Sequence, residues 1–424
     1  MPCCSDTSPD FELRGRTMLT STGFRVFANP RAQRNAPYAD DGRAAILSLA
    51  ALACAKREIM AWPGYKPTPL HLLPKLAARA GIGAILYKDE AERFGLGSFK
   101  ALGGAYAVFK LLQKSIREQK NVTASSLDLT SGRYADVTSR ITVTCATDGN
   151  HGRSVAWGAR TFGCRCVIYI PETVSAGRCQ AIAAYGAEVR RFTGTYDDGV
   201  RRAAADAAAQ GWMVVSDTAY EGYTDVPRDV MQGYSLMVEE AVRQTSALPS
   251  HVFVQGGVGG LAAGVCSYLW ERYGAARPYF VIVEPEKADC FYRSGVAGRP
   301  TPAEGALDTI MAGLACGEVS PLAWRILATG ADAFMTIDDE AAVDCMRLLA
   351  DGRFGDDPVV AGESAVAGLA GLLMASADAD ARARLDLHRD SRVLVFGTEG
   401  ATDPEVYRGI VGRRPDEVVA RRST

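Results

Sequence analysis

Between residues 141 and 216 the sequence alternates short apolar runs, typical of buried strands, with stretches of helical periodicity. We expect strands at 166–170, 188–192 and 212–216, and helices at 180–185 and 197–209. Parallel strands need a crossover connection, usually a helix, so this alternation predicts a largely parallel sheet flanked by helices. An α/β fold is therefore the strongest constraint that the chain places on its own architecture.

The chain has 424 residues, more than a single hydrophobic core usually organises. We therefore predict two lobes, each with a largely parallel twisted sheet flanked by helices. Residues 44–103 and 217–424 are assigned to the larger lobe and residues 104–216 to the smaller one. Residues 1–43 are polar and interrupted by prolines, which favours an irregular arm, and the polar stretch 119–140 is expected to be a loop.

The composition argues against several classes of protein. Basic and acidic residues nearly balance, at 47 against 49, without the basic block that nucleic acid or a membrane surface would require. The eleven cysteines are scattered and the four histidines lie far apart, so no local metal motif is formed. The apolar stretch 44–55 is too short to span a membrane. We expect a reduced, cytoplasmic protein whose partner is a small molecule.

Lys100 follows a turn that contains glycine and precedes an apolar run at helical spacing. Its amine is therefore expected at a helix N-terminus, among Phe94, Leu96 and Phe99. The positive end of the helix dipole and apolar surroundings both disfavour an ammonium group. We expect a neutral, nucleophilic amine that can condense with the aldehyde of pyridoxal 5'-phosphate (PLP). A surface lysine at the start of a helix is the alternative.

The GGVGG turn, residues 256–260, lies between a predicted strand at 252–254 and a helix that begins near Leu261. Ligands of open α/β sheets gather at such carboxyl ends of strands. Backbone amides at a helix N-terminus form a nest for an anion such as a phosphate group. Tight packing of strand on helix explains the turn about as well on its own, but phosphate is the better interpretation beside a candidate PLP lysine.

The TDGNHG turn, residues 147–152, also joins a strand to a helix, and its amides are candidates for binding a substrate carboxylate. The candidate substrate contacts here are Thr147, Gly149 and His151. A packing role is the simpler interpretation of His151. Asn150 offers an amide donor for a phenolic oxygen, and Asp148 is either an N-cap or a functional carboxylate.

Five segments together resemble the diaminopropionate ammonia-lyases, which are PLP enzymes of fold type II, the tryptophan-synthase-like fold. These are SFK at 98–100, TDGNHGR at 147–153, SDTAYEGYT at 216–224, GGVGG at 256–260 and GTEGATDP at 397–404. The resemblance runs from about residue 64 to residue 408. The glycine turns belong to the whole superfamily, whereas ERFGL, ATDGNHGR and DTAYEGYT are typical of this branch. The N-terminal arm and the predicted loop at 119–140 are longer than the family leads us to expect.

The resemblance implies how PLP would be held. Lys100, next to Phe99, would form the Schiff base with the cofactor. Thr398 would place a hydroxyl against the pyridine nitrogen, and Asn150 would contact the ring hydroxyl. The phosphate would be held by Gly256, Gly257, Val258, Gly259 and Gly260.

The resemblance also implies two acidic residues beside the substrate. Asp148 and Asp217 would hold the distal ammonium group of 2,3-diaminopropionate, and Asp148 would act as a second base beside Lys100. The predicted reaction is β-elimination of the D- or L-amino acid to pyruvate and two ammonia, by a homodimer.

Two other functions are kept as alternatives. A PLP-dependent dehydratase of the same fold would act on serine, threonine or hydroxyaspartate, but a hydroxyl leaving group has no use for both Asp148 and Asp217. A non-catalytic amino-acid-binding homologue is less favoured because Lys100 is retained. No metal site is predicted for any of these.

Cys266 and Cys290 are a candidate disulfide pair. They follow GGVGG and the next predicted strand, and a parallel strand–helix step brings such positions towards each other. The alternative is that both cysteines are free, buried thiols. In a reducing cytosol this alternative is at least as favourable as the disulfide.

Overall fold

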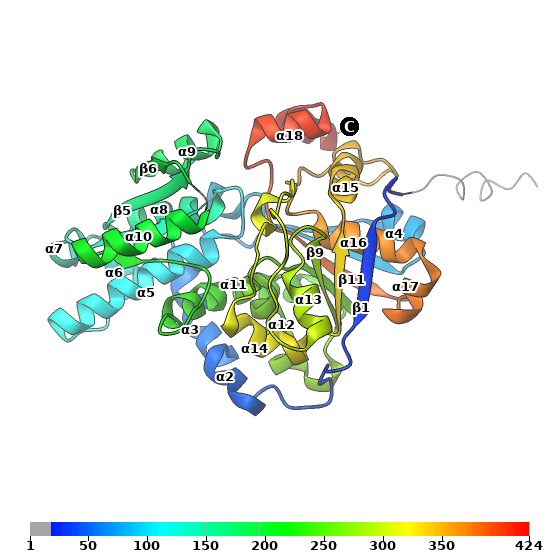
Figure 1. The fold of residues 1–424 in the computed structure, drawn as a ribbon, viewed down its shortest axis with the longest axis horizontal. Helices are drawn as coiled ribbons and strands as arrows, with labels where there is room; N and C mark the ends of the chain where they lie inside the picture. The colour runs from blue at the N-terminus through cyan, green and yellow to red at the C-terminus, as the bar shows by residue number, and fades with distance from the viewer. Residues whose placement is uncertain (1–17, 148, 195, 424) are drawn as a thin grey trace, which may run out of the picture.

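Two β-sheets organise the protein, whose structure is a computed structural model that describes residues 18–147, 149–194 and 196–423. One sheet has seven strands and the other has four. In Figure 1 the four-stranded sheet and its helices lie on the left and the seven-stranded sheet lies on the right. The α/β fold predicted from the sequence is confirmed, since most strand pairs of both sheets are parallel.

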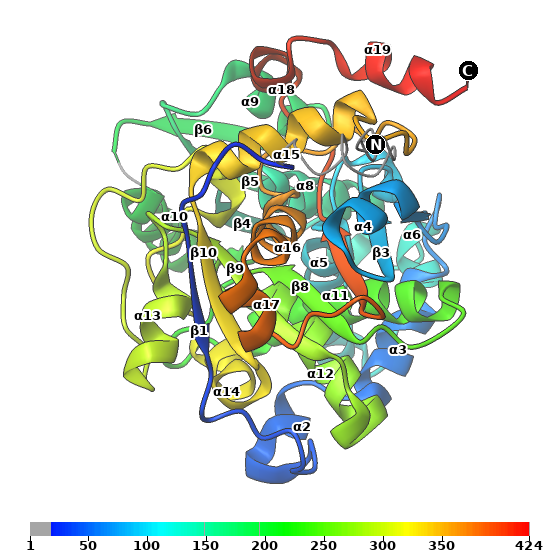
Figure 2. The same ribbon diagram turned by 90° about the vertical axis from the view of Figure 1, so that its right-hand side faces the viewer.

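The seven-stranded sheet has the order β1-β10-β9-β8-β11-β3-β2, with antiparallel strands only at its two edges. Its strands are β1 (Phe24–Ala28), β2 (Leu70–Leu72), β3 (Ala84–Asp89), β8 (His251–Gln255), β9 (Tyr279–Pro285), β10 (Ala333–Ile337) and β11 (Arg392–Gly397). Every residue of β8 and β10 is buried, because helices cover both faces of the sheet (Figure 2). Two separate hydrophobic clusters pack on these two faces.

The four-stranded sheet is parallel throughout and has the order β6-β5-β4-β7. Its strands are β4 (Thr142–Ala146), β5 (Arg165–Pro171), β6 (Glu188–Phe192) and β7 (Met213–Val214), and the connecting helices are α8 (Asn150–Phe162), α9 (Ala176–Ala183) and α10 (Tyr196–Gln210). The sequence located these strands and helices to within a few residues, although the strand expected at 212–216 is shorter.

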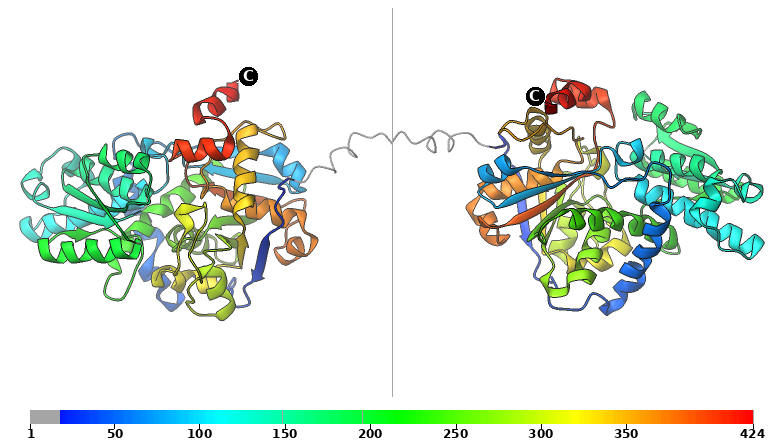
Figure 3. Two further views of the ribbon diagram at one scale, coloured as in Figure 1. Left: turned by 45° about the horizontal axis from the view of Figure 1, so that its top comes forward. Right: turned by 180° about the vertical axis from the view of Figure 1, so that it is seen from behind.

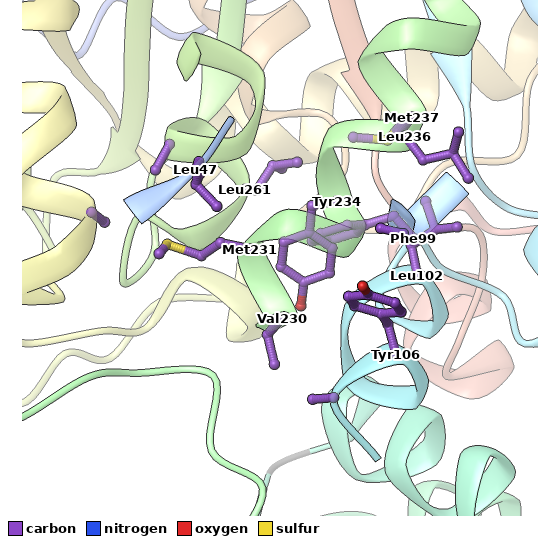
Figure 4. Close-up of a cluster of buried hydrophobic side chains, with 14 of the residues drawn as sticks. Leu47, Phe99, Leu102, Tyr106, Val230, Met231, Tyr234, Leu236, Met237 and Leu261 are labelled. Atoms are coloured by element: carbon purple, nitrogen blue, oxygen red, sulfur yellow. The ribbon is translucent and has the colours of Figure 1, made fainter. Parts of the chain in front are cut away.

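Three long helices link the two sheets. They are α5 (Ala101–Lys120), α11 (Asp225–Gln244) and α12 (Gly260–Tyr273). Helix α5 packs against α8 on one side and α11 on the other, and α11 packs against α12. A side chain at Gly103 of α5 would clash with Tyr234 of α11, so this glycine permits the close helix contact. Figure 4 shows the buried side chains, including Phe99, Leu102 and Tyr234, that fill the contact.

The sequence suggested an irregular N-terminal segment, but part of this segment forms a strand. Residues 24–28 form β1, which pairs with β10 and forms an edge of the seven-stranded sheet (Figure 3). A single helix expected at 44–60 is divided into α2 (Arg43–Ile46) and α3 (Leu49–Ile59). The division has a local cause, because Ser48 adopts an extended conformation and caps α3 by accepting the Ala51 N–H.

The stretch 119–140 is also more ordered than the predicted loop, since α5 extends to Lys120 and two short helices follow, α6 (Ser126–Thr130) and α7 (Ala135–Thr138). The remaining helices are α4 (Pro74–Ala80), α13 (Cys290–Ala297), α14 (Pro321–Gly330), α15 (Asp339–Asp351), α16 (Ala367–Ala377), α17 (Ala379–Arg384), α18 (Pro404–Val411) and α19 (Pro415–Val419). Among the described residues, no helix combines the length and the apolar character needed to cross a membrane.

Candidate active site

Lys100 is the N-cap residue of α5, where the sequence placed it. The segment before it lies against the turn that follows β11. The Phe99 N–H donates to the Thr398 carbonyl oxygen at 3.0 Å, and the Gly400 N–H donates to the Gly97 carbonyl oxygen at 3.0 Å. Two motifs that are about 300 positions apart in the sequence therefore form one structural unit around the candidate PLP lysine.

The Lys100 amine is paired with Asp217, whose Oδ2 lies 2.7 Å from Nζ. Burial lowers the pKa of Lys100, but the charge of Asp217 and the hydrogen bond with it outweigh burial and raise that pKa above its ordinary value. Burial likewise favours protonated Asp217, but Lys100 dominates and holds the pKa of this carboxyl below its usual range. The structure thus contradicts the neutral amine expected from the sequence, because pairing with a carboxylate favours the ammonium form of Lys100.

His151 lies next to this ion pair. Its Nε2 lies 2.7 Å from the Val215 carbonyl oxygen, and its Nδ1 lies 3.8 Å from Asp217 Oδ2. A carbonyl oxygen only accepts, so Nε2 carries the proton. Burial lowers the pKa of His151. A neutral, buried histidine agrees with the packing interpretation and also brings the side chain against Asp217.

The GGVGG turn leads from β8 into the N-terminus of α12. Gly257 and Gly259 have φ angles of +60° and +96°, which side-chain-bearing residues rarely adopt. A side chain at Gly259 would clash with Phe291, and a Cβ at Gly256 would lie 2.7 Å from Glu284. The turn is therefore restricted to glycine at these positions, and it lies at a helix N-terminus. The Gly256 N–H donates to the Val283 carbonyl oxygen at 3.0 Å and the Gly259 N–H to the Gly256 carbonyl oxygen at 3.1 Å, so these two amides are already engaged within the protein.

This turn also adjoins the ion pair. A Cβ at Gly260 would lie 4.0 Å from the Asp217 carbonyl oxygen. The turn is also held by Ser320, whose N–H donates to the Val258 carbonyl oxygen at 2.9 Å. The structure thus brings the predicted phosphate turn and the predicted lysine into one neighbourhood, although their roles stay predictions.

Asp148, in the TDGNHG turn, lies outside the described residues. Thr147 Oγ1 accepts the Gly149 N–H at 3.1 Å and the Gly152 N–H at 3.2 Å, and the Thr147 N–H donates to the Tyr169 carbonyl oxygen at 3.1 Å. The amides of Thr147 and Gly149 are thus already engaged within the protein. As carboxylate donors they would have to exchange these partners.

Glu399, which is buried and follows Thr398, was not predicted from the sequence. Asn150 Nδ2 donates to one oxygen of Glu399, and the Ser364 N–H donates to the other at 3.2 Å. Burial raises the pKa of Glu399. Asn150, predicted to contact the PLP ring, is thus oriented by a carboxylate. An acidic residue between the threonine and the glycine of the GTEG turn was a signal that could have indicated it.

Arg178 of α9 is paired with carboxylates near the N-termini of α16 and α18, and it was also not predicted from the sequence. Its Nη2 lies 3.1 Å from Glu363 Oε1, and Ser175 at the start of α9 donates to Asp403 Oδ2 at 2.8 Å. The Arg178 side chain lies beside Gly149, so this ion pair borders the TDGNHG turn. No local pattern in the sequence indicates such a contact.

A buried network of four charges fixes the ERFGL segment before Lys100. Lys88 and Arg93 donate to Glu240 at 2.9 and 2.7 Å, and Arg93 also donates to Glu90 at 2.8 Å. All four side chains are at most 5% exposed. Because two positive charges face two negative ones, the network is balanced, and it ties α11 to the turn that carries Lys100.

Cys266 and Cys290 do not form the candidate disulfide, since both are free and buried. Cys266 of α12 packs towards Gly330, whereas the Cys290 thiol lies 3.4 Å from Glu284 Oε1 and near the Gly257 carbonyl oxygen. The two thiols therefore have different neighbours, and the alternative of two free thiols holds.

The residues around Lys100 fit PLP. A partly buried lysine stands at a helix start, and a turn of four glycines and Val258 presents backbone amides for a phosphate group. In addition, the buried hydroxyl of Tyr234, beside Lys100, has no hydrogen-bond partner among the described residues. A site with these properties can hold an aldehyde cofactor covalently and its phosphate by backbone amides.

Comparison with known proteins defines the class. Residues 61–399 match the family model described as "Pyridoxal-phosphate dependent enzyme". The match covers most of the chain and includes Lys100, the GGVGG turn and Thr398. The chain belongs to the pyridoxal-phosphate dependent enzymes.

The relatives narrow this class further. The chain is 43% identical over 355 residues to diaminopropionate ammonia-lyase of Escherichia coli K12, covering 82% of this chain and 88% of the relative. A crystal structure of the holo form of the Escherichia coli enzyme matches with a TM-score of 0.84 and 38% identity, covering 93% and 97% of the two chains. Another, in complex with an aminoacrylate-PLP azomethine reaction intermediate, matches with a TM-score of 0.83 and 38% identity, covering 93% and 98%. Within its class the chain belongs to the diaminopropionate ammonia-lyase family.

Proposed function

We propose that this chain catalyses β-elimination of 2,3-diaminopropionate. The α-hydrogen and the β-amine are lost, and the first ammonia leaves. Hydrolysis of the released 2-aminoacrylate then gives pyruvate and a second ammonia. The observation that carries the proposal is the Lys100–Asp217 pair beside a glycine turn, in a chain of this family.

PLP, when bound, supplies the electron sink for loss of the α-hydrogen. In our proposal Lys100 binds it covalently and the Gly256–Gly260 turn holds its phosphate. Asn150, held by Glu399, would contact the ring hydroxyl, and Thr398 would lie against the ring nitrogen. The protein's part is to orient the substrate, exclude water and place proton acceptors.

Asp217 distinguishes this reaction from dehydration. Its carboxylate is kept ionised by Lys100, so it can also attract a substrate ammonium group. A substrate with a second ammonium group would gain from this charge, whereas serine or threonine would not. In the dehydratase alternative Asp217 would keep Lys100 as its partner, but the substrate would offer it no second ammonium group.

The test of the proposed function is a product count. The purified PLP-loaded protein is incubated separately with D- and L-2,3-diaminopropionate, serine and threonine, and pyruvate and ammonia are measured. We expect two ammonia per pyruvate and a clear preference for diaminopropionate. One ammonia per pyruvate, from serine or threonine at a higher rate, would establish the dehydratase instead.

Asp148 is proposed as the base for the D-isomer. D- and L-amino acids held by the same groups present the α-hydrogen on opposite faces, so a single base cannot serve both. If Lys100 serves one face, Asp148→Asn removes the other base while keeping the side-chain shape. We expect turnover of the D-isomer to fall by roughly two to four decades, the usual contribution of a positioned base.

Separate kcat/KM measurements for the two isomers check this prediction. The L-isomer should lose much less turnover with Asp148→Asn. Equal losses for both isomers would indicate that Asp148 binds the substrate or caps α8, and an unchanged D-isomer rate would remove it from the reaction.

We further propose a homodimer in a reducing cytosol. The scattered cysteines, without the paired spacing of a disulfide framework, support the reducing environment. Sedimentation of the purified protein would decide between a monomer and a dimer.

A further inference from the structure

The Tyr234 hydroxyl is a buried polar group without a hydrogen-bond partner among the described residues. Tyr234 is 1% exposed and lies on α11. Leaving a buried hydroxyl unpaired costs free energy, so such a group is rare unless something engages it in another state of the protein.

Packing fixes the position of this hydroxyl. The Tyr234 ring lies 4.6 Å from the Phe99 ring, and Figure 4 shows these two side chains next to each other. A side chain at Gly103 would clash with the Tyr234 ring, and a Cβ at Gly260 would lie 3.7 Å from it. The ring is therefore held between the start of α5 and the end of the GGVGG turn.

The Lys100 amine lies over this ring, with Nζ 5.9 Å from its centroid. A lysine ammonium has three N–H donors, and among the described residues Asp217 is the one group that meets hydrogen-bond geometry with Lys100 Nζ. An amine with unused donors thus lies beside a hydroxyl with no partner.

We propose that the Tyr234 hydroxyl is the second hydrogen-bond partner of the Lys100 amine, engaged when Asp217 is drawn away from it. This makes Tyr234 a positioning residue for Lys100. The consequence for turnover rests on the proposed function, in which the distal ammonium of the substrate competes with Lys100 for Asp217. Tyr234 then keeps the amine in place and stabilises the ammonium that forms when Lys100 accepts a proton.

The charged and titratable neighbours agree with this assignment. Burial raises the pKa of Tyr234, against the charge of Lys100 and the side-chain interaction with its amine, so the phenol stays protonated. In this structure the two groups face each other without reaching hydrogen-bond geometry. Besides Tyr234, the groups that face Lys100 are Asp217, His151 and Cys316. Asp217 is the one carboxylate of this set, so its removal exposes the contribution of the hydroxyl.

The experiment uses the cofactor-free protein and PLP as the probe. The rate at which Lys100 captures PLP depends on the neutral fraction of its amine, so its pH profile reports the pKa of Lys100. The profile is recorded for the wild type, Tyr234→Phe, Asp217→Asn and the double variant. Tyr87→Phe is the matched control, because Tyr87 is equally buried, also has an unpartnered hydroxyl, and packs in the hydrophobic cluster on the other face of the seven-stranded sheet.

Asp217→Asn should move the midpoint of the profile to lower pH, since an adjacent charge shifts a pKa by roughly 1 to 3 units. Adding Tyr234→Phe should lower it by about one further unit, as expected for a lost hydrogen bond to a charged group. In the presence of Asp217 the same substitution should have a smaller effect. With saturating PLP, Tyr234→Phe should lower kcat for diaminopropionate about tenfold with KM nearly unchanged.

Thermal unfolding should show no destabilisation by Tyr234→Phe, because the ring and its packing remain. An unchanged midpoint on adding Tyr234→Phe to Asp217→Asn would overturn the proposal, and so would an equal shift with Tyr87→Phe. The capture experiment needs no amino-acid substrate, so it stays decisive even if the product count contradicts the proposed function.

Discussion

Replacing Lys100 by alanine is expected to abolish covalent binding of PLP and to lower turnover of diaminopropionate by at least about four decades, because the nucleophile and one base are lost together. The wild type should show a visible absorbance from the lysine-bound cofactor that changes on addition of substrate. After borohydride reduction, the labelled peptide should contain Lys100 in the wild type, and Lys100→Ala should carry no label.

Lys114→Ala is the matched control for this prediction. Lys114 lies on the same helix, α5, and its side chain is exposed. It should keep the absorbance, the label at Lys100 and the full rate. A colourless wild type that takes up no PLP would refute the assignment of Lys100.

Replacing Glu240 by glutamine should have the largest effect on stability. The change leaves Lys88 and Arg93 facing a single remaining carboxylate, Glu90, in a buried setting. Removing one partner of a buried ion pair costs about 3 to 5 kcal/mol, because the other charge is left uncompensated. For a chain of this length that corresponds to a fall of roughly 3 to 6 °C in Tm.

Asp225→Asn is the matched control, because Asp225 lies on the same helix and forms an ion pair with Arg228 at the surface. The Asp225 side chain is 73% exposed. Its loss should change the free energy of unfolding by no more than about 0.5 kcal/mol. Similar Tm values for the two variants would show that the buried network contributes no more than a surface pair.

The buried network also predicts a pH dependence. Burial favours protonated Glu240, but Arg93 and Lys88 outweigh it and lower its pKa below the ordinary value of 4.5. The stability that Glu240 contributes is therefore present above about pH 4.5 and is lost as the pH falls through the lowered pKa. Glu240→Gln should remove this part of the acid sensitivity.

Local patterns in the sequence located much of the fold. Alternating apolar and helical segments predicted the parallel strands β5 and β6, and the position of Lys100 at the start of α5 followed from turn residues and helical spacing. The edge strand β1 was not predicted, because a strand of five residues acquires its identity only by pairing with β10. The short helices in the stretch 119–140 were not predicted, because the polar residues there show no hydrophobic periodicity of a helix.

The same division applies to the site. The sequence by itself determined the family, the lysine at a helix N-terminus and the glycine turn before α12, because each depends on the order of neighbouring residues. Only the tertiary structure decided the protonation of Lys100 and the presence of Tyr234 beside it, and it also assembled the balanced network around Glu240. These properties depend on groups more than a hundred positions apart being brought within a few ångströms, where electrostatic interactions and hydrogen bonds become strong enough to set a pKa.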